Sequence, residues 1–285
     1  MNGRTSESGN ALSLDHLSYS TLSSFTSCPR KVYLEKIKKA EPLPAWFFVV
    51  GSAVHRFIEY SISPYATRTV DSFFHEEVVK ARLIEPATSL WLHGGSKEAP
   101  VVEGLALEQA RACSEAALEF LEDMEIWEVE PDITGHLPGC SMPIKAFPDM
   151  IGEHKKHGPV IIDWKTGSSK PKDNLQLETY NCLMKHGEMV HTSSPTMSSV
   201  EFKGLFVMLK PGTSKARPVK LIETPESMGQ KFAEIERRIK ANAWPAIPQF
   251  NCRFCVMRPN CKLGGGVTER SAYYDRVEHD GGIPF

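Results

Sequence analysis

The sequence predicts an α/β protein in which a mixed central sheet is flanked by helices. Three observations lead to this class: a helical apolar pattern in the first part of the chain, three strand-like runs in its middle, and a hairpin followed by a helix near its end. The composition agrees, because 285 residues with 41% hydrophobic and 24% charged side chains are typical of a soluble globular protein.

The first elements are expected to be helices. Capping-type Ser and Thr residues ahead of apolar ones in residues 18–37 predict two short helices around Cys28. A further helix is expected to begin near Gly51, and His55 and Glu59 would share one of its faces because they stand four residues apart.

A long helix is expected to cover the sheet. Residues 63–100 are weakly patterned and predict no defined element. The segment after them carries apolar residues at helical spacing, namely Cys113, Ala117, Phe120 and Met124.

The middle of the chain predicts strands. Residues 126–133, 142–152 and 159–165 alternate or run apolar between turn residues, and they are interpreted as three strands of a meander. The sequence thus places a sheet behind the long helix.

The remaining elements are a helix, a hairpin and a last helix. Residues 175–185 predict a helix, and residues 202–210 and 216–224 predict the two strands of a hairpin. Thr224 as cap and Pro225 in the first turn predict the start of the last helix.

Three segments are expected along the chain. They are a flexible arm over 1–17, a folded domain over 18–263 and a flexible tail over 264–285, and the folded domain divides into a helical part over 18–125, a core over 126–223 and a terminal helix with a cysteine cluster over 224–263.

Charge and cysteine content limit the possible partners, the cellular location and the role of the thiols. With 33 Lys and Arg against 35 Asp and Glu, the net charge of -2 offers no whole-molecule attraction to a polyanion, so such a partner needs a local basic cleft. There is no export signal and no apolar stretch of about 20 residues, so we expect a cytoplasmic protein (in the host cytoplasm if viral) without a membrane partner. Seven cysteines then favour metal ligation or free thiols over disulfides.

Two carboxylates and a lysine are expected to converge. Asp163 and Lys165 stand two apart on a strand and project to the same side, and a hairpin turn can bring Asp149 beside them. Such oxygen ligands hold Mg²⁺ or Mn²⁺ for phosphodiester hydrolysis, while the lysine orients water or stabilises charge. The alternative is a surface hairpin with weak ion pairs.

Two further features extend this group. Gln176 and Tyr180 stand four apart on one helical face. His55 offers an imidazole as a third metal ligand, which favours Mn²⁺ somewhat more than carboxylates alone do. The alternative for His55 is a structural histidine.

Together these residues resemble the PD-(D/E)xK nuclease superfamily, in its RecB-like branch. The matching motifs are Gly51 to His55, Pro148-Asp149, Asp163-Trp164-Lys165 and Gln176 to Tyr180. Residue 163 is Asp rather than Glu, and both occur in the family. The resemblance implies a restriction-endonuclease-like core. It also implies metal ligation by His55, Asp149, Asp163 and the Trp164 carbonyl, catalysis by Lys165, and organisation of the site and the DNA strand by Gln176 and Tyr180.

Three late cysteines, Cys252, Cys255 and Cys261, have the spacing of metal ligands and need a fourth. Among the candidates, Cys113 and Cys182 are expected in the core, whereas Cys140 in a turn and Cys28 stay open.

The cysteine pattern resembles that of iron-sulfur nucleases of the AddB and CRISPR-associated (Cas-four) type. This resemblance implies that Cys28 and the three late cysteines hold a [4Fe-4S] cluster that staples the two chain ends. A structural Zn²⁺ is the alternative, because spacing and ligand type do not separate the two.

Nucleic-acid and protein contacts are expected at three places. Arg30 and Tyr33 in a basic run, together with Arg56, suit single-stranded DNA, with a solvated helix face as the alternative. The ending Ile283-Pro284-Phe285 resembles the tip of bacterial single-stranded DNA-binding proteins, which docks on replication and repair partners, with a disordered terminus as the alternative.

The leading hypothesis is a metal-dependent DNA exonuclease that acts on single-stranded ends in replication, recombination or repair. One alternative is a DNA-binding recombination accessory with a weak or inactive centre and a structural four-cysteine metal site. Another is a zinc-stapled scaffold without DNA affinity, which leaves the convergence of His55, Asp149, Asp163 and Lys165 unexplained.

Overall fold

The computed structural model of the chain describes residues 14–84, 99–167, 170–186, 189–191, 195–210, 212–249, 252 and 255–261. Most of the expected arm, the expected tail and its Ile283-Pro284-Phe285 tip lie outside the described residues. Leu17, at the end of the expected arm, is fully buried and forms a bridge with Ile144. The folded chain therefore begins before residue 18.

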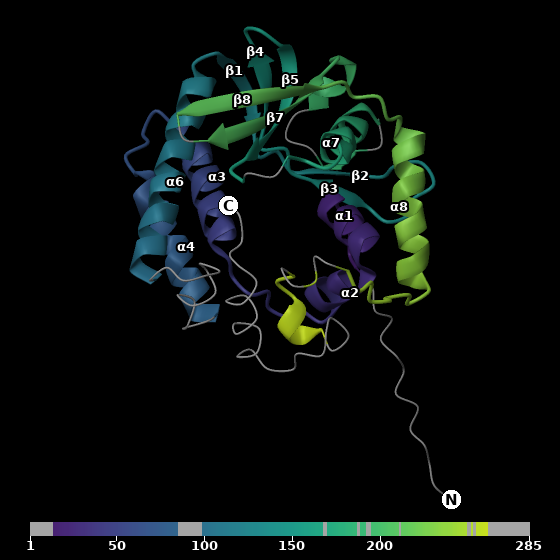
Figure 1. The fold of residues 1–285 in the computed structure, drawn as a ribbon. Coiled ribbons are helices and arrows are strands. Elements are labelled where there is room, and N and C mark those ends of the chain that lie inside the picture. Colours follow the sequence, from purple (N-terminus) through teal and green to yellow (C-terminus); the bar gives the residue numbers. More distant parts are fainter. Residues whose placement is uncertain are drawn as a thin grey trace, which may run out of the picture.

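A mixed sheet of five strands forms the centre of the molecule (Figure 1). Its β5 and β7 are parallel and the other neighbours are antiparallel. The strands in spatial order are β1 (Met124–Val129), β4 (Met150–His154), β5 (Gly158–Lys165), β7 (Lys203–Lys210) and β8 (Thr213–Val219). A second sheet has the order β3 (Ile144–Ala146), β2 (Ile133–Gly135), β6 (Met189–His191). The predicted mixed α/β class is confirmed.

Helices cover both faces of the larger sheet (Figure 1). On one face α6 (Ala99–Leu121) packs on β7 and β8, and α3 (Trp46–Ser61) and α4 (Val70–Ile84) pack against α6. On the other face α7 (Leu175–Lys185) packs on β5 and β7, and α1 (Tyr19–Ser27) and α8 (Pro225–Lys240) pack against α7. Short helical turns complete the described chain: α2 (Pro29–Val32), η1 (Tyr33–Ile37), η2 (Pro195–Ser199) and η4 (Arg258–Asn260). Within the described residues, none of the helices has the length and apolar character required to cross a membrane.

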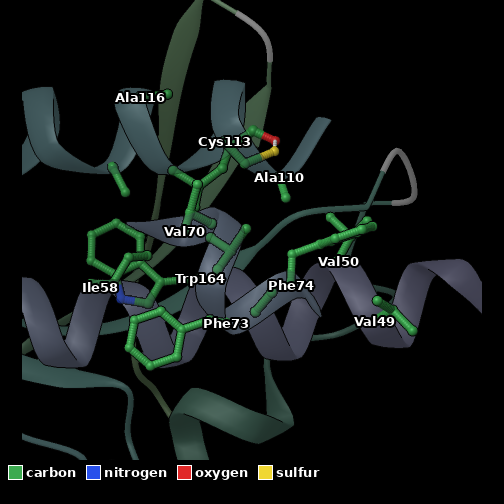
Figure 2. Packing of buried hydrophobic residues seen from close by; sticks show 14 of the residues in the cluster. Val49, Val50, Ile58, Val70, Phe73, Phe74, Ala110, Cys113, Ala116 and Trp164 are labelled. Atoms are coloured by element: carbon green, nitrogen blue, oxygen red, sulfur yellow. Dashed lines mark hydrogen bonds between the residues drawn. The ribbon is translucent and has the colours of Figure 1, made fainter. Parts of the chain in front are cut away.

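Strand β5 separates two hydrophobic cores by the alternation of its side chains. Ile162 and Trp164 pack into the core under α3, α4 and α6, where the Trp164 ring (labelled in Figure 2) meets the Phe120 ring edge-on at 5.5 Å. Ile161 belongs to the core under α7 and α8. Because side chains two residues apart share a face, Asp163 is directed toward the α7 side.

Several predicted boundaries agree with the structure. Helix α7 covers residues 175–185, and α8 begins after Thr224, whose hydroxyl accepts a hydrogen bond from Ser227 N. The α3 helix begins at Trp46 instead of near Gly51, since Trp46, Val49 and Val50 form a buried apolar face ahead of Gly51.

The predicted meander differs from the structure. Residues 126–133 divide into parts of β1 and β2, and residues 142–152 divide into β3 and β4, which belong to different sheets. Pro131 and Pro148 lie at the two breaks, where proline cannot donate a ladder hydrogen bond.

Two glycines in helices provide a matched test of packing. A Cβ on Gly229 of α8 would lie 2.0 Å from the Pro138 carbonyl oxygen, whereas a Cβ on Gly104 of α6 would have nothing within 4 Å. We expect Gly229→Ala to destabilise the protein by about 1–3 kcal/mol. Gly104→Ala should stabilise it by up to about 1 kcal/mol, because alanine favours helix. Urea unfolding of both variants checks this, and equal midpoints would contradict it.

Candidate active site

The β4–β5 hairpin brings Asp149 to the end of the sheet ladder. Met150 pairs with Ile162 in antiparallel register, so Asp149 stands opposite Asp163 one step further on. The Asp149 side chain continues the ladder, since its Oδ2 accepts a hydrogen bond of 2.6 Å from Trp164 N. The N–H and C=O of a paired strand residue point to the same side. The Trp164 carbonyl therefore faces the same edge as Asp149.

Helix α3 supplies His55 to the same edge. The imidazole Nδ1 lies 3.1 Å from Asp149 Oδ1. Burial alone would lower the pKa of His55, but the charge and hydrogen bond of Asp149 outweigh burial and raise it. The helix approaches the end of β5 closely at Gly51, where a Cβ would lie 3.5 Å from Thr166 Oγ1. His55 and Asp149 are thus held as a pair by packed elements.

Asp163 is the most enclosed acid of the site, with 3% of its surface exposed. Its Oδ2 forms an ion pair of 2.5 Å with Lys165 Nζ but has no aligned hydrogen bond. Burial, and then the charge of Asp149, raise the pKa of Asp163 to about 7, while Lys165 and His55 oppose the shift. A buried carboxylate whose one close partner is an ammonium group keeps further lone pairs that can accept a metal cation.

A chain of hydrogen bonds leads from Lys165 into α7. Lys165 Nζ donates to Gln176 Oε1 at 3.0 Å, and Gln176 Nε2 donates to the Tyr180 hydroxyl at 2.8 Å. Burial, and then the Asp163 charge, raise the pKa of Tyr180 well above its usual value of 10.0. Tyr180 is therefore a neutral hydroxyl that orients Gln176, and Gln176 orients the ammonium group.

Glu130 is a site residue that the sequence analysis missed. One ligand atom each of His55, Glu130 and Asp149 lie within 4.8 Å of one another, and Asp163 is outside this group. Glu130 has a left-handed φ of 45° after β1, and its N–H donates to the Asp149 carbonyl at 3.2 Å. Burial, and then the charges of Glu59 and Asp149, raise the pKa of Glu130. The strand pattern around Glu130 contained no signal for this turn.

The four predicted cluster ligands meet in one pocket of about 220 Å³, here called the thiol pocket: Cys28, Cys252, Cys255 and Cys261. The other three cysteines are buried in the cores, where burial raises the pKa of Cys113 to about 11 and those of Cys140 and Cys182 to about 12. Cys140 does not line the pocket. Cys28 is thus the early cysteine that accompanies the three late ones.

The thiol pocket is lined by residues from both ends of the described chain, and Figure 1 shows the early helix α2 beside the late yellow helical turn. Leu43 N donates to the Val256 carbonyl at 2.9 Å, and Arg30 N donates to the Pro245 carbonyl at 3.2 Å. Gln249 N donates to Cys252 Sγ at 3.3 Å. Among the described residues, no three thiol sulfurs lie within 4.8 Å of one another.

The predicted DNA contacts are engaged in local interactions. The Arg56 guanidinium lies 2.7 Å from both Glu76 and Glu77. The Arg30 guanidinium lies 4.6 Å from the centroid of the Tyr33 ring, which contacts Trp244 at 5.6 Å. Arg56 lines a pocket together with His55, whereas Arg30 lies beside Tyr33, away from that pocket.

Comparison with known proteins gives a family match over most of the chain. Residues 16–262 match the family model described as the PD-(D/E)XK nuclease superfamily. A solved protein described as SSO0001 is 16% identical, with a TM-score of 0.34, and the match covers 74% of this chain and 84% of that chain. None of the curated proteins is significantly similar in sequence. The family match includes every residue of the edge around Asp149 and all four cysteines of the thiol pocket.

Proposed function

Since the chain belongs to the PD-(D/E)XK nuclease superfamily, we propose that it is a metal-dependent DNA exonuclease that acts on single-stranded ends. The observation that carries this proposal is the convergence of His55, Asp149, Asp163 and Lys165 at the end of β5. Replication, recombination and repair, which produce such ends, are the processes in which we propose that it acts.

The donor groups fit a hard divalent cation. His55, Asp149, Asp163 and the Trp164 carbonyl would hold it, and Glu130 offers one more carboxylate. Bound Mg²⁺ or Mn²⁺ supplies an activated water and neutralises charge on the phosphate.

The remaining groups position the lysine. Lys165 Nζ can donate to the attacking water or to a phosphate oxygen, because Gln176 holds it beside Asp163. Tyr180 fixes the Gln176 amide through its hydroxyl, so the carbonyl oxygen of that amide faces the ammonium group. The three side chains form one positioning unit for the strand that is cut.

The experiment that tests this function uses end-labelled substrates. Linear single strands, blunt duplexes, circular single strands and RNA are incubated with Mn²⁺, Mg²⁺ or EDTA. We expect stepwise degradation of linear single strands that EDTA abolishes, and no degradation of circles. Cutting of circles would replace the exonuclease assignment with an endonuclease. Intact substrates under every condition would refute the nuclease proposal.

The pH dependence of metal binding gives a separate prediction. The pKa of Asp163 is about 7 and the pKa of His55 is raised, and both groups must lose a proton before they ligate a cation. Mn²⁺ should therefore bind more tightly as pH rises through about 7. Calorimetry in buffers of different ionisation enthalpy counts the protons released for each ion. We expect fewer protons to be released for each ion at about pH 9 than at about pH 6, and a number that does not change with pH would contradict metal ligation by Asp163 and His55.

For the thiol pocket we propose a [4Fe-4S] cluster in preference to Zn²⁺. Four thiolates also suit tetrahedral Zn²⁺, so the metal content of the purified protein decides between the two groups. The pocket of about 220 Å³ suits a larger group, and four thiolates are the usual ligands of a four-iron cluster.

A further inference from the structure

Three phenylalanines are exposed, and two of them, Phe47 and Phe48, line a pocket with His55 of the candidate active site. Phe47, Phe48 and Phe147 are 59%, 47% and 49% exposed, and every other phenylalanine in the described part of the chain is buried or half-buried. Phe147 stands two residues before Asp149. Large apolar side chains that are exposed together on a soluble protein mark binding sites. The exposed phenylalanines therefore indicate a surface that contacts a ligand beside the metal-binding edge.

Phe47 and Phe48 share a pocket with His55, here called the aromatic pocket, of about 510 Å³. Both rings lie in the first turn of α3, and His55 follows two helical turns later. At about 1.5 Å per residue this separation is about 10–12 Å, or roughly three stacked nucleotides at about 3.4 Å each. Gly51 and Ser52, which lie between them in the helix, also line this pocket. A strand held at His55 thus extends naturally over the two rings.

The chemistry of the aromatic pocket favours a flat apolar group over an anion. The cations that line it are already paired, since Arg56 Nη1 and Lys80 Nζ lie 2.7 Å and 2.6 Å from Glu77 Oε1. The Phe47 and Phe48 rings are 4.3 Å apart and tilted by 51°, so they offer faces in two directions. Base stacking on aromatic rings stabilises single strands and tolerates any sequence. In a duplex, each base is already stacked between its neighbours, so its face cannot stack on the Phe47 or Phe48 ring.

We propose that Phe47 and Phe48 form a stacking platform for unpaired nucleobases of the strand whose phosphate lies at Asp149 and Asp163. This inference rests on the proposed function and names its substrate class as unpaired nucleic acid. It assigns to the start of α3 a role in substrate selection that is separate from metal ligation by His55 in the same helix. The proposed occupant is a nucleic acid strand. An apolar protein segment is the competing occupant, and the experiment below distinguishes the two.

Binding without cleavage tests the platform directly. The full-length protein is titrated in EDTA into a fluorescently labelled oligothymidine, with anisotropy as the readout. Replacing both Phe47 and Phe48 by Ala should weaken binding about tenfold or more. Tyr65→Ala is the matched control, because Tyr65 is 86% exposed and does not line the aromatic pocket, and it should bind like the wild type.

An abasic oligonucleotide separates stacking from structural damage. Without bases, the wild type should bind as weakly as the double variant, and the double variant should lose nothing further. As a second variant, Phe48→Trp should retain affinity, and oligothymidine should quench its additional fluorescence. Two results would overturn the platform and favour an apolar protein segment as the occupant. One is unchanged oligothymidine affinity in the double variant, and the other is an equal loss of affinity in both proteins when the bases are removed.

The two proposals fail in different ways. Ring-dependent binding without any EDTA-sensitive cleavage would refute the nuclease and support the platform. EDTA-sensitive cleavage of single strands that is equally efficient in the double variant and the wild type would refute the platform and support the nuclease.

Discussion

Replacing Asp163 by Asn is expected to lower metal-dependent cleavage by about a thousandfold or more. Asp163 is the enclosed acid of the site, and its Oδ2 already attracts one cation, the Lys165 ammonium group 2.5 Å away. The amide keeps the shape of the side chain but removes its charge, so the ligand is lost while the packing stays. The measurement is initial cleavage rate in Mn²⁺, with circular dichroism melting as the check on folding.

A control variant near the turn of the β4–β5 hairpin distinguishes the loss of a site carboxylate from the general effect of removing a negative charge. Asp123 pairs with Lys155 at 2.8 Å beside the β4–β5 turn, and the Asp123 side chain is 56% exposed. Asp123→Asn should therefore cleave like the wild type, because an exposed pair contributes little.

Lys165→Met should lose cleavage but retain Mn²⁺ binding, since the ammonium group is not a metal ligand. An Asp163→Asn protein that turns over at the wild-type rate would remove Asp163 from the site.

Replacing Cys255 by Ser is expected to remove iron and sulfide from the purified protein and to lower its melting temperature by about 10 °C. The thiol pocket links an early and a late segment of the chain, so its loss acts like the loss of a cross-link, which destabilises by about 2–5 kcal/mol. In a chain of this size each kcal/mol shifts the melting temperature by about 2–4 °C. Iron and sulfide analysis, visible absorbance and calorimetry measure the three effects.

The matched control for this variant is another cysteine. Cys182 is buried in the core under α7 and does not line the thiol pocket. Cys182→Ala should keep the iron and sulfide of the wild type, whatever small loss of packing it causes. About four iron atoms per chain in the wild type support the cluster, whereas a single zinc ion and no iron would replace it with the structural zinc site.

The elements that could be predicted from the sequence depend on local patterns. The helix over residues 175–185 and the Thr224 cap agree with the structure because spacing and capping act within one or two turns. The alternation along β5 separated Asp163 from Trp164 for the same reason.

The parts that could not be predicted depend on long-range pairing and backbone geometry. The small sheet of β2, β3 and β6 joins segments that only the finished fold brings together. Glu130 enters the site through a left-handed turn, which a non-glycine residue rarely adopts and a strand pattern does not announce. The ion pairs that engage Arg56 come from α4, whose segment was too weakly patterned for a prediction.

The distribution of the thiol pocket along the chain sets an order of events during biosynthesis. All strands of the larger sheet, and every acid around Asp149, leave the ribosome before Cys252. Cys28 is synthesised early, and the other three cysteines of the thiol pocket follow only after more than 200 further residues. Under the proposed cluster assignment, insertion therefore follows synthesis of the candidate active site, and a chain that terminates before Cys252 has only one of the four thiols of the thiol pocket.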